Sequence, residues 1–362
     1  MPCFSKRLFL LVLLLPLPAL ATPTGPATPV LETLVVTGVQ PGPGLWQVRH
    51  GEHTLWIMGT LSPLPRRMDW EPRELDALVA EADRVLAPPR GSVTTGLGVF
   101  GQLRLLPAAL RARNLPEDQR LVDVLPPELY ARWQVQKARW IGESPVLERR
   151  RPMLAAFELM EEALDDLDLE RENIVWRRVE RIARREDREI LRVRVEAQLD
   201  DPRQALREFT ESGFDDTACL DATLTRLEND TGTLVERANA WAVGDTATLL
   251  ERRFDDELRA CMLAVLNTET AKKRGLDNLP QQLVDEWLRV ASESLEAKPR
   301  TLAVADLRLL LAEDGLLAGL RARGYRVLAP GEATDLTPDE AFGEPPVEAQ
   351  PEPVQPSPEA LR

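Results

Sequence analysis

The sequence predicts an α+β fold in which the N- and C-terminal segments form a small mixed β-sheet and enclose a large helical insertion. Residues 45–59 have two apolar-rich strands on either side of Gly51-Glu52, which is typical of a β-hairpin. Residues 300–329 read as strand, helix and strand, a βαβ unit with a parallel crossover. Between these two ends, apolar residues recur mainly every three or four positions, so residues from about 96 to 297 are predicted to be mostly helical.

The hairpin is the first predicted element. Its strands are "LWQVRH" and "HTLWIMG", and Gly51 at the first central position of the turn suits a type II′ conformation. This pairing places four apolar side chains on one face of the hairpin: Trp46, Val48, Leu55 and Ile57.

The remaining elements follow from periodicity and from proline and glycine positions. A helix with Pro72 in its first turn is expected over 72–83, followed by a short strand that proline stops at 84–89. Alternation predicts one half-exposed strand at 190–197, and helical spacing predicts one long helix at 217–242. The other expected helices cover 152–167, 174–187, 255–266, 279–297 and 312–324, and the closing strands cover 300–306 and 325–329.

The first 21 residues predict a cleaved signal peptide. Lys6-Arg7 precede an apolar run from Leu8 to Leu15, and Ala19 and Ala21 have the spacing of a signal-peptidase site. We expect a periplasmic or secreted protein after cleavage near Ala21, with no membrane span in the mature chain. Residues 22–43 are rich in Pro, Gly and Thr and are interpreted as an extended leader.

Charge is concentrated at the C-terminal end. The 362-residue chain has a formal net charge of −14, and residues 331–362 combine many prolines and acids, so this tail is expected to be disordered. No basic patch with interleaved aromatics occurs in the sequence, which argues against nucleic-acid binding. Partner identity and oligomeric state do not follow from the sequence.

Two cysteines remain after signal cleavage, Cys219 and Cys261. In an oxidising compartment such a pair is more often bridged than free, so we expect a disulfide between them. It would clamp the helix at 217–242 to the helix at 255–266. Two buried thiols are the alternative.

Candidate catalytic groups are few. The only histidines, His50 and His53, flank the hairpin turn; they could share a metal with Glu52, but a solvated turn explains them more simply. Ser62 could act as a nucleophile only with a positioned base, and both histidines lie at the opposite end of the same strand, roughly 20 Å away. Trp133 and Trp140 are interpreted as core residues, with a peptide- or glycan-binding surface as the alternative.

Two segments resemble one family. The hairpin "LWQVRHGEHTLWIMGT" and the closing unit "RTLAVADLRLLLAEDGLLAGLRARGYRV" are similar to the TraB/GumN proteins, relatives of the Tiki proteases. The resemblance spans about residues 44–329 and implies one domain over 44–330. It also implies a Gly-x-x-His motif at a strand end in each half, where the histidines and acids hold a divalent metal for peptide hydrolysis.

This chain departs from that motif at each ligand position. Gly59 begins the first motif, but Ser62 stands at the histidine position. In the second motif, "DLRL", Asp306 replaces glycine and Leu309 replaces histidine. The acid expected after the next strand falls in "APP" at 87–89, which contains none.

The sequence therefore predicts a catalytically degenerate family member without a metal or other cofactor. We expect it to bind a protein or peptide partner in a residual crevice near Gly59–Ser62 and Asp306. The alternative is a metal-dependent or rebuilt hydrolase that uses Ser62, Asp306 and acids from the helical middle.

Overall fold

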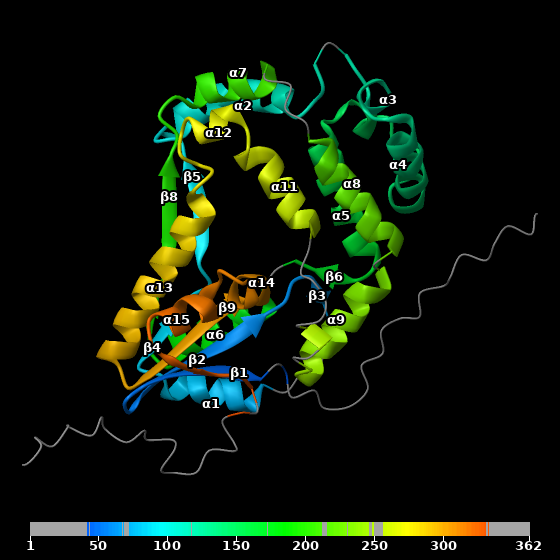
Figure 1. The fold of residues 1–362 in the computed structure, drawn as a ribbon. Helices are drawn as coiled ribbons and strands as arrows, with labels where there is room; N and C mark the ends of the chain where they lie inside the picture. The colour runs from blue at the N-terminus through cyan, green and yellow to red at the C-terminus, as the bar shows by residue number, and fades with distance from the viewer. Residues whose placement is uncertain are drawn as a thin grey trace, which may run out of the picture. The chain divides into compact units, whose positions relative to one another are not determined.

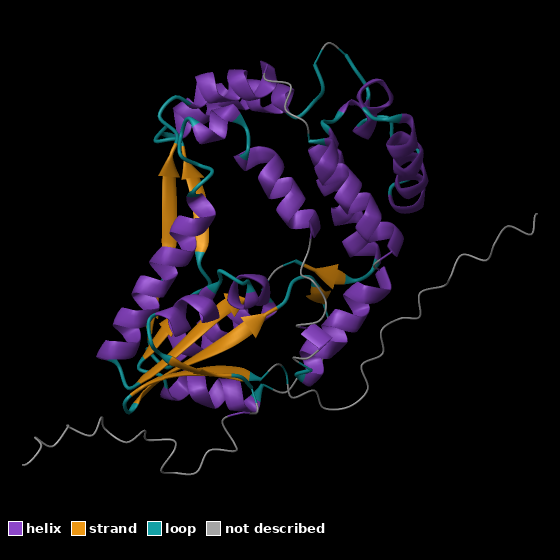
Figure 2. Cartoon of the chain, in the orientation of Figure 1, coloured by secondary structure: helices purple, strands orange, loops and turns teal. Residues whose placement is uncertain are grey.

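The computed structural model describes residues 42, 44–66, 68, 72–116, 118–171, 173–211, 216–229, 231–245, 248–249, 256–330 and 332 (Figures 1 and 2). The expected signal peptide (1–21) and nearly all of the leader (22–43) and tail (331–362) lie outside these residues. Within the described part, no helix is both long enough and apolar enough to cross a membrane.

A six-stranded mixed sheet joins the two ends of the domain, which confirms the predicted α+β class (Figure 2). The strand order is β10-β1-β2-β9-β4-β7. The strands are β1 (Leu45–His50), β2 (His53–Thr60), β4 (Arg84–Leu86), β7 (Glu189–Leu191), β9 (Arg300–Asp306) and β10 (Arg326–Leu328).

The predicted hairpin is confirmed. β1 and β2 pair antiparallel from Leu45↔Met58 to His50↔His53. The four apolar residues expected on one face, Trp46, Val48, Leu55 and Ile57, are all buried. Burial of one face fixes the register, because a slip of one residue would turn these side chains to the other face.

The closing unit differs from the prediction in one respect. β9 pairs parallel with β2, whereas β10 pairs antiparallel with β1. β9 and β10 therefore run in the same direction, as a parallel crossover requires, but the hairpin lies between them. The hairpin fits there because an antiparallel pair leaves β1 and β2 each one open edge for a further strand.

Among the described residues, several helices pack against the sheet strands and against one another around the sheet. Their buried faces follow the predicted apolar spacing; in α13, for example, Val284, Trp287, Leu288, Ala291 and Leu295 are buried. These helices are α1 (Arg73–Glu81), α6 (Ile174–Arg185), α13 (Leu279–Ala297), α14 (Leu307–Leu311) and α15 (Leu316–Ala322).

A second hydrophobic core lies among the helices of the middle region. Trp133 is fully buried there, which supports its interpretation as a core residue. Most of this core is supplied by α3 (Leu121–Val124), α4 (Pro127–Trp140), the 3-10 turn η1 (Leu147–Arg149), α5 (Pro152–Asp166), α8 (Thr217–Asn229) and α11 (Asp256–Leu266).

The strand predicted at 190–197 is two strands in two sheets. β7 joins the main sheet next to β4, while β8 (Arg194–Gln198) pairs parallel with β5 (Arg90–Thr94). Pro88 and Pro89 lie between β4 and β5, the strands that pair with β7 and β8. Because proline has no N–H group to donate to a strand ladder, strand pairing stops there. A further small sheet pairs β3 (Leu64–Pro65) with β6 (Leu169–Glu170).

The long helix predicted at 217–242 is also divided. α8 ends at Asn229, and α9 (Thr231–Val243) begins two residues later. Thr231 and Gly232 open the second helix, and both have low helix propensity, which favours an interruption at this point. The other helices in the described part of the chain are α2 (Val99–Ala112), α7 (Pro202–Glu211) and α12 (Glu269–Lys272).

Candidate functional site

The ends of β2 and β9 lie side by side. Gly59 pairs with Ala305, and Thr60 pairs with Asp306, at the carboxyl ends of two adjacent parallel strands. In parallel sheets, ligands commonly bind in the crevice beyond these ends. The structure therefore brings the N-terminal and C-terminal motif segments together, as their resemblance to the family requires.

The polar groups at the end of β2 are used in internal hydrogen bonds. The Thr60 hydroxyl donates to the Ala305 carbonyl (3.2 Å) and accepts from Asn173 Nδ2 (3.0 Å). Ser62 Oγ donates to the carbonyl oxygen of Arg171 (2.8 Å). These bonds fasten the end of β2 to the segment that precedes α6.

Asp306 is likewise engaged by its own segment. Its carboxylate accepts from the Arg308 amide (2.9 Å) and so caps the N-terminus of α14. The Arg308 side chain donates to the same carboxylate from Nε (2.9 Å) and Nη2 (3.0 Å). Leu309 lies within α14 and is half-buried. The position that corresponds to the second family histidine therefore offers no polar atom.

Gly59 lies where close packing leaves no room for a side chain. A Cβ atom at this position would lie 2.3 Å from Leu307 Cδ2 and 2.9 Å from Trp46 Cζ3, closer than real Cβ contacts. Its carbonyl oxygen also accepts a hydrogen bond from Trp241 Nε1 of α9 (3.0 Å). The glycine is thus explained by close packing at the strand end.

The two histidines lie at the hairpin turn, at the opposite end of β2 from these residues. His50 and His53 are register partners next to the hairpin turn. His53 Nδ1 lies 2.8 Å from the Leu295 carbonyl oxygen, and the His50 ring packs edge-on against Tyr325 with 5.6 Å between ring centroids. Neither can serve Ser62 as a base.

The residues at the motif positions do not fit the metal that the family resemblance implies. They offer a hydroxyl that is hydrogen-bonded to backbone, an apolar side chain, and a carboxylate bound by arginine. Across the described residues, no three His, Cys, Asp or Glu side chains are grouped so that they could hold a metal ion.

A pocket of about 560 Å³ lies next to this site. It opens where the β4–β7 pair gives way to the β5–β8 pair, beside the first two turns of α6. Its apolar wall is formed by Ala87, Pro88, Trp176 and Val193, and the rest of its lining comprises Asn173, Glu180 and five arginines: Arg90, Arg171, Arg177, Arg192 and Arg194.

Arg171 and Asn173 connect the pocket to the motif segment. Asn173 lines the pocket and also donates to Thr60, and Arg171 lines the pocket while its carbonyl binds Ser62. Ser62 and Leu309 themselves are not among the residues that line the pocket. Ala87 and Pro88 belong to the "APP" segment that lacks the family's acid.

Sequence reasoning missed this pocket. The alternation at 190–197 predicts one continuous half-exposed strand, and the apolar spacing at 174–187 predicts a helix, but neither pattern by itself indicates a pocket. The available signal was Arg90 beside Pro88-Pro89, Arg192 and Arg194 in the 190–197 segment, and Arg171 and Arg177 at the start of the 174–187 helix. Their convergence depends on the break between the two sheets.

The two cysteines are brought together within the helical core. Cys219 of α8 and Cys261 of α11 lie at disulfide-bonding distance, with their Cα atoms 4.4 Å apart. The arrangement is the one that the expected disulfide requires.

The comparisons with known proteins agree with this architecture. The model of the TraB/PrgY/gumN family matches residues 44–329. The chain belongs to this family. Comparisons with curated proteins and with solved structures found no match. Membership in the TraB/PrgY/gumN family explains why the two ends of the domain meet in one sheet, while the residues at its motif positions depart from the metal-binding pattern described above.

Proposed function

We propose that this chain is an exported, catalytically degenerate member of the TraB/PrgY/gumN family that acts by binding a protein or peptide partner. The observation that carries the proposal is the state of the motif positions. Ser62, Leu309 and Asp306 supply one hydroxyl bound to backbone, one apolar group and one carboxylate bound to Arg308. A metal site needs several convergent ligands with free lone pairs, and these residues do not provide them.

A binding role is supported by what adjoins the motif. Asn173 and Arg171 link the ends of β2 to a pocket of about 560 Å³, within the range of natural ligand sites. A rebuilt hydrolase receives less support, because a serine nucleophile needs a base within hydrogen-bonding reach. Ser62 instead donates to a carbonyl, and both histidines lie at the other end of β2.

Metal content and peptide turnover test the proposal. The full exported chain and its Asp306→Asn variant are incubated separately with Mn²⁺, Co²⁺ and Zn²⁺, freed of unbound metal, and analysed by mass spectrometry of the elements. Asn is chosen because it keeps the helix cap. We expect bound metal well below one ion per chain in both proteins and no cleavage of a broad peptide library.

The assignment as catalytically degenerate is overturned if the chain binds one metal ion per molecule. It is also overturned if the chain cleaves the peptide library under conditions in which an active metallopeptidase control does so.

The same preparation tests export. N-terminal sequencing of protein from the extracytoplasmic fraction is expected to begin at Thr22, and a chain found only in the cytoplasm with residues 1–21 attached contradicts that part.

A further inference from the structure

The arginines of the pocket beside α6 are not equivalent in their bonding. Arg192 donates to Glu180 (2.6 Å), and Arg177 pairs with Glu170 (3.1 Å). For Arg90, Arg171 and Arg194, by contrast, the described part of the chain provides no side-chain hydrogen bond or ion pair. Three arginines that line the pocket thus have no anionic partner among the described residues.

Two of these arginines oppose each other directly. Arg90 and Arg194 are register partners in the parallel β5–β8 pair, so their side chains leave the same face of adjacent strands. Strands in a sheet lie about 4.8 Å apart, and like charges placed directly opposite are destabilising. An anion bound between the two arginines would remove this repulsion.

The pocket is also extended along α6. Asn173, Trp176, Arg177 and Glu180 line it, and their spacing places them on one face of the helix over two turns. Seven residues of helix correspond to about 10 Å. Arg171 lies near the Asn173 end of the pocket, and Arg192, which is paired with Glu180, lies at the other end. A single small anion cannot contact both.

The lining combines charge with an apolar wall. Trp176 and Val193 are 7% and 2% exposed, and Ala87 is 5% exposed, so they form a buried surface beneath the arginines. In an extended peptide, successive side chains point to opposite sides of the backbone. The side chains of residues i and i+2 therefore lie on the same side, roughly 7 Å apart. A segment of three to four residues matches the length of the pocket, with its backbone and carbon stems on the apolar wall.

We propose that this pocket binds an extended peptide segment that carries two or more acidic side chains, which Arg90, Arg171 and Arg194 recognise. The inference rests on the proposed function, because it names the kind of partner. Guanidinium groups bind carboxylates through paired hydrogen bonds, which gives these arginines a geometric preference as well as a charge preference. The net charge of the whole chain, −14, repels acidic peptides, so attraction must come from this local cluster.

Fluorescence anisotropy provides the test. The probe is a fluorescein-labelled hexapeptide that alternates glutamate and glycine, and its control carries glutamine in place of glutamate. The full chain is compared with the double variant Arg90→Gln/Arg194→Gln. The matched control is Arg104→Gln/Arg203→Gln, which removes two exposed arginines of α2 and α7 and leaves the pocket unchanged.

We expect binding of the glutamate peptide and not of the glutamine peptide, and a rise in Kd of about tenfold or more in the pocket variant alone. Binding should weaken as salt is added. The proposal is overturned if both double variants bind alike, if the glutamine peptide binds equally well, or if inorganic phosphate at the same concentration displaces the peptide completely.

Thermal unfolding of the unliganded proteins gives a second readout that does not depend on the choice of peptide. Because the substitution removes two like charges that oppose each other, the unfolding midpoint of Arg90→Gln/Arg194→Gln should equal or exceed that of the wild type. A clearly lower midpoint shows that these arginines stabilise the fold and contradicts the inference.

The outcomes distinguish this inference from the proposed function. Peptide turnover with intact binding would overturn the proposed function alone, and absent binding without turnover would overturn this inference alone.

Discussion

At the scale of single residues, Gly59 occupies a position where a side chain has no room. The end of β2 approaches Leu307 and Trp46 so closely that only a residue without Cβ fits. Both neighbours are themselves buried, so neither can move aside at low cost. The glycine of the first motif is therefore required by the fold of this chain, whatever its role in other members of the family.

Substitution of Gly59 by alanine should destabilise the protein. Overpacking of a filled core typically costs about 1–3 kcal/mol, and we expect a loss of that size in the free energy of unfolding measured with urea. Gly91→Ala is the matched control, because its Cβ would lie 3.5 Å from Leu279, an ordinary contact distance. Equal stability of the two variants would contradict the packing explanation.

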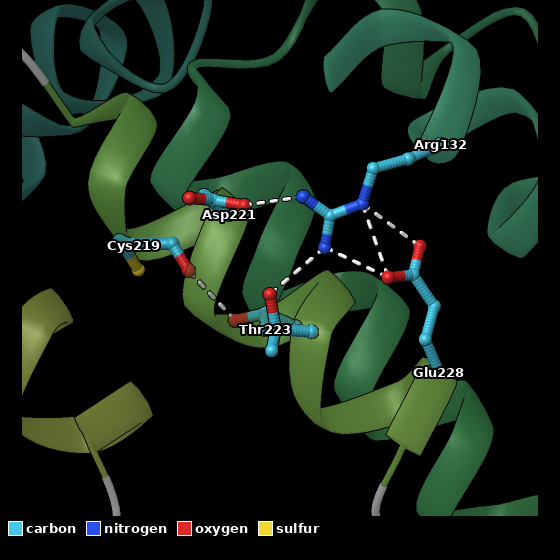
Figure 3. A network of polar contacts seen from close by, with 6 residues as sticks. Arg132, Cys219, Asp221, Thr223 and Glu228 are labelled. Atoms are coloured by element: carbon cyan, nitrogen blue, oxygen red, sulfur yellow. Dashed lines mark hydrogen bonds and ion pairs between the residues drawn. The ribbon is translucent and has the colours of Figure 1, made fainter. Parts of the chain in front are cut away.

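At the scale of elements, α8 connects the parts of the helical core. It packs against α4, α5 and α11, and its Cys219 lies at disulfide-bonding distance from Cys261 of α11. Figure 3 shows a second link: the Arg132 guanidinium of α4 donates to Glu228 (2.8 Å) and Asp221 (2.5 Å) of α8. The same guanidinium also donates to the Thr225 hydroxyl (2.8 Å). Arg132 is 34% exposed, so solvent screening limits this ion pair to about 1 kcal/mol or less.

The covalent link should matter more than the ion pair. The two cysteines are 42 residues apart, and closing a loop of that length in the unfolded chain corresponds to about 4 kcal/mol of stabilisation in the chain-entropy model. We expect Cys219→Ser/Cys261→Ser to lower the free energy of unfolding by about 2–4 kcal/mol.

Reductant provides the control for this prediction. The wild-type chain purified under oxidising conditions should gain the mass of two hydrogens on reduction and unfold more easily, whereas the double serine variant should show neither change. Free thiols in the untreated wild-type protein would contradict the disulfide.

At the scale of the whole molecule, stability depends on carboxylates that must stay ionised. Glu148 is 2% exposed and accepts hydrogen bonds from Lys137 Nζ (2.7 Å), Trp133 Nε1 (3.1 Å) and Gln134 Nε2 (3.0 Å). Burial by itself raises the pKa of Glu148, but these hydrogen bonds outweigh it and hold the pKa below its ordinary value. Hydrogen bonds from arginine also lower the pKa of Glu180 and Glu286.

Acid should therefore unfold the protein. Because the pKa of Glu148 is lower in the folded state, the unfolded state binds the proton more tightly. Its contribution is complete above the unfolded pKa of about 4.3 and is lost as the pH falls through the folded pKa. We expect the unfolding free energy, measured with urea between about pH 6 and pH 3, to fall steeply below about pH 4.3.

The double variant Lys137→Met/Glu148→Leu tests whether this buried pair causes the pH dependence of the unfolding free energy. Each single substitution leaves one buried group without its partner and should cost about 3–5 kcal/mol at neutral pH, while the double variant should lose less than the sum. Its stability should also depend less on pH than that of the wild type. An unchanged slope would assign the acid sensitivity to other carboxylates.

The sequence predicted most of the elements because their signals are local. The hairpin, α13 and β9 follow from alternation, helical spacing and a central glycine, and their predicted ranges agree with the structure. The helix expected at 312–324 begins only at Leu316, after a separate short helix, α14. The expectations at 190–197 and 217–242 each joined elements that are separate. In each case periodicity continued across a break, and periodicity carries no information about which strand or helix lies alongside.

Some features of the candidate site also follow from local sequence, and others follow only from the tertiary structure. The sequence by itself determined the family, the α+β class, the pairing of the two chain ends and the loss of ligand types at Ser62 and Leu309, because these depend on residue identity and local pattern. Only the tertiary structure decided that β1 and β2 separate β9 from β10, that Asp306 is held by Arg308, and that Arg90 opposes Arg194 beside α6. Such contacts join residues more than a hundred positions apart, or depend on one side-chain conformation, and they form only when the packed core fixes the register of the strands.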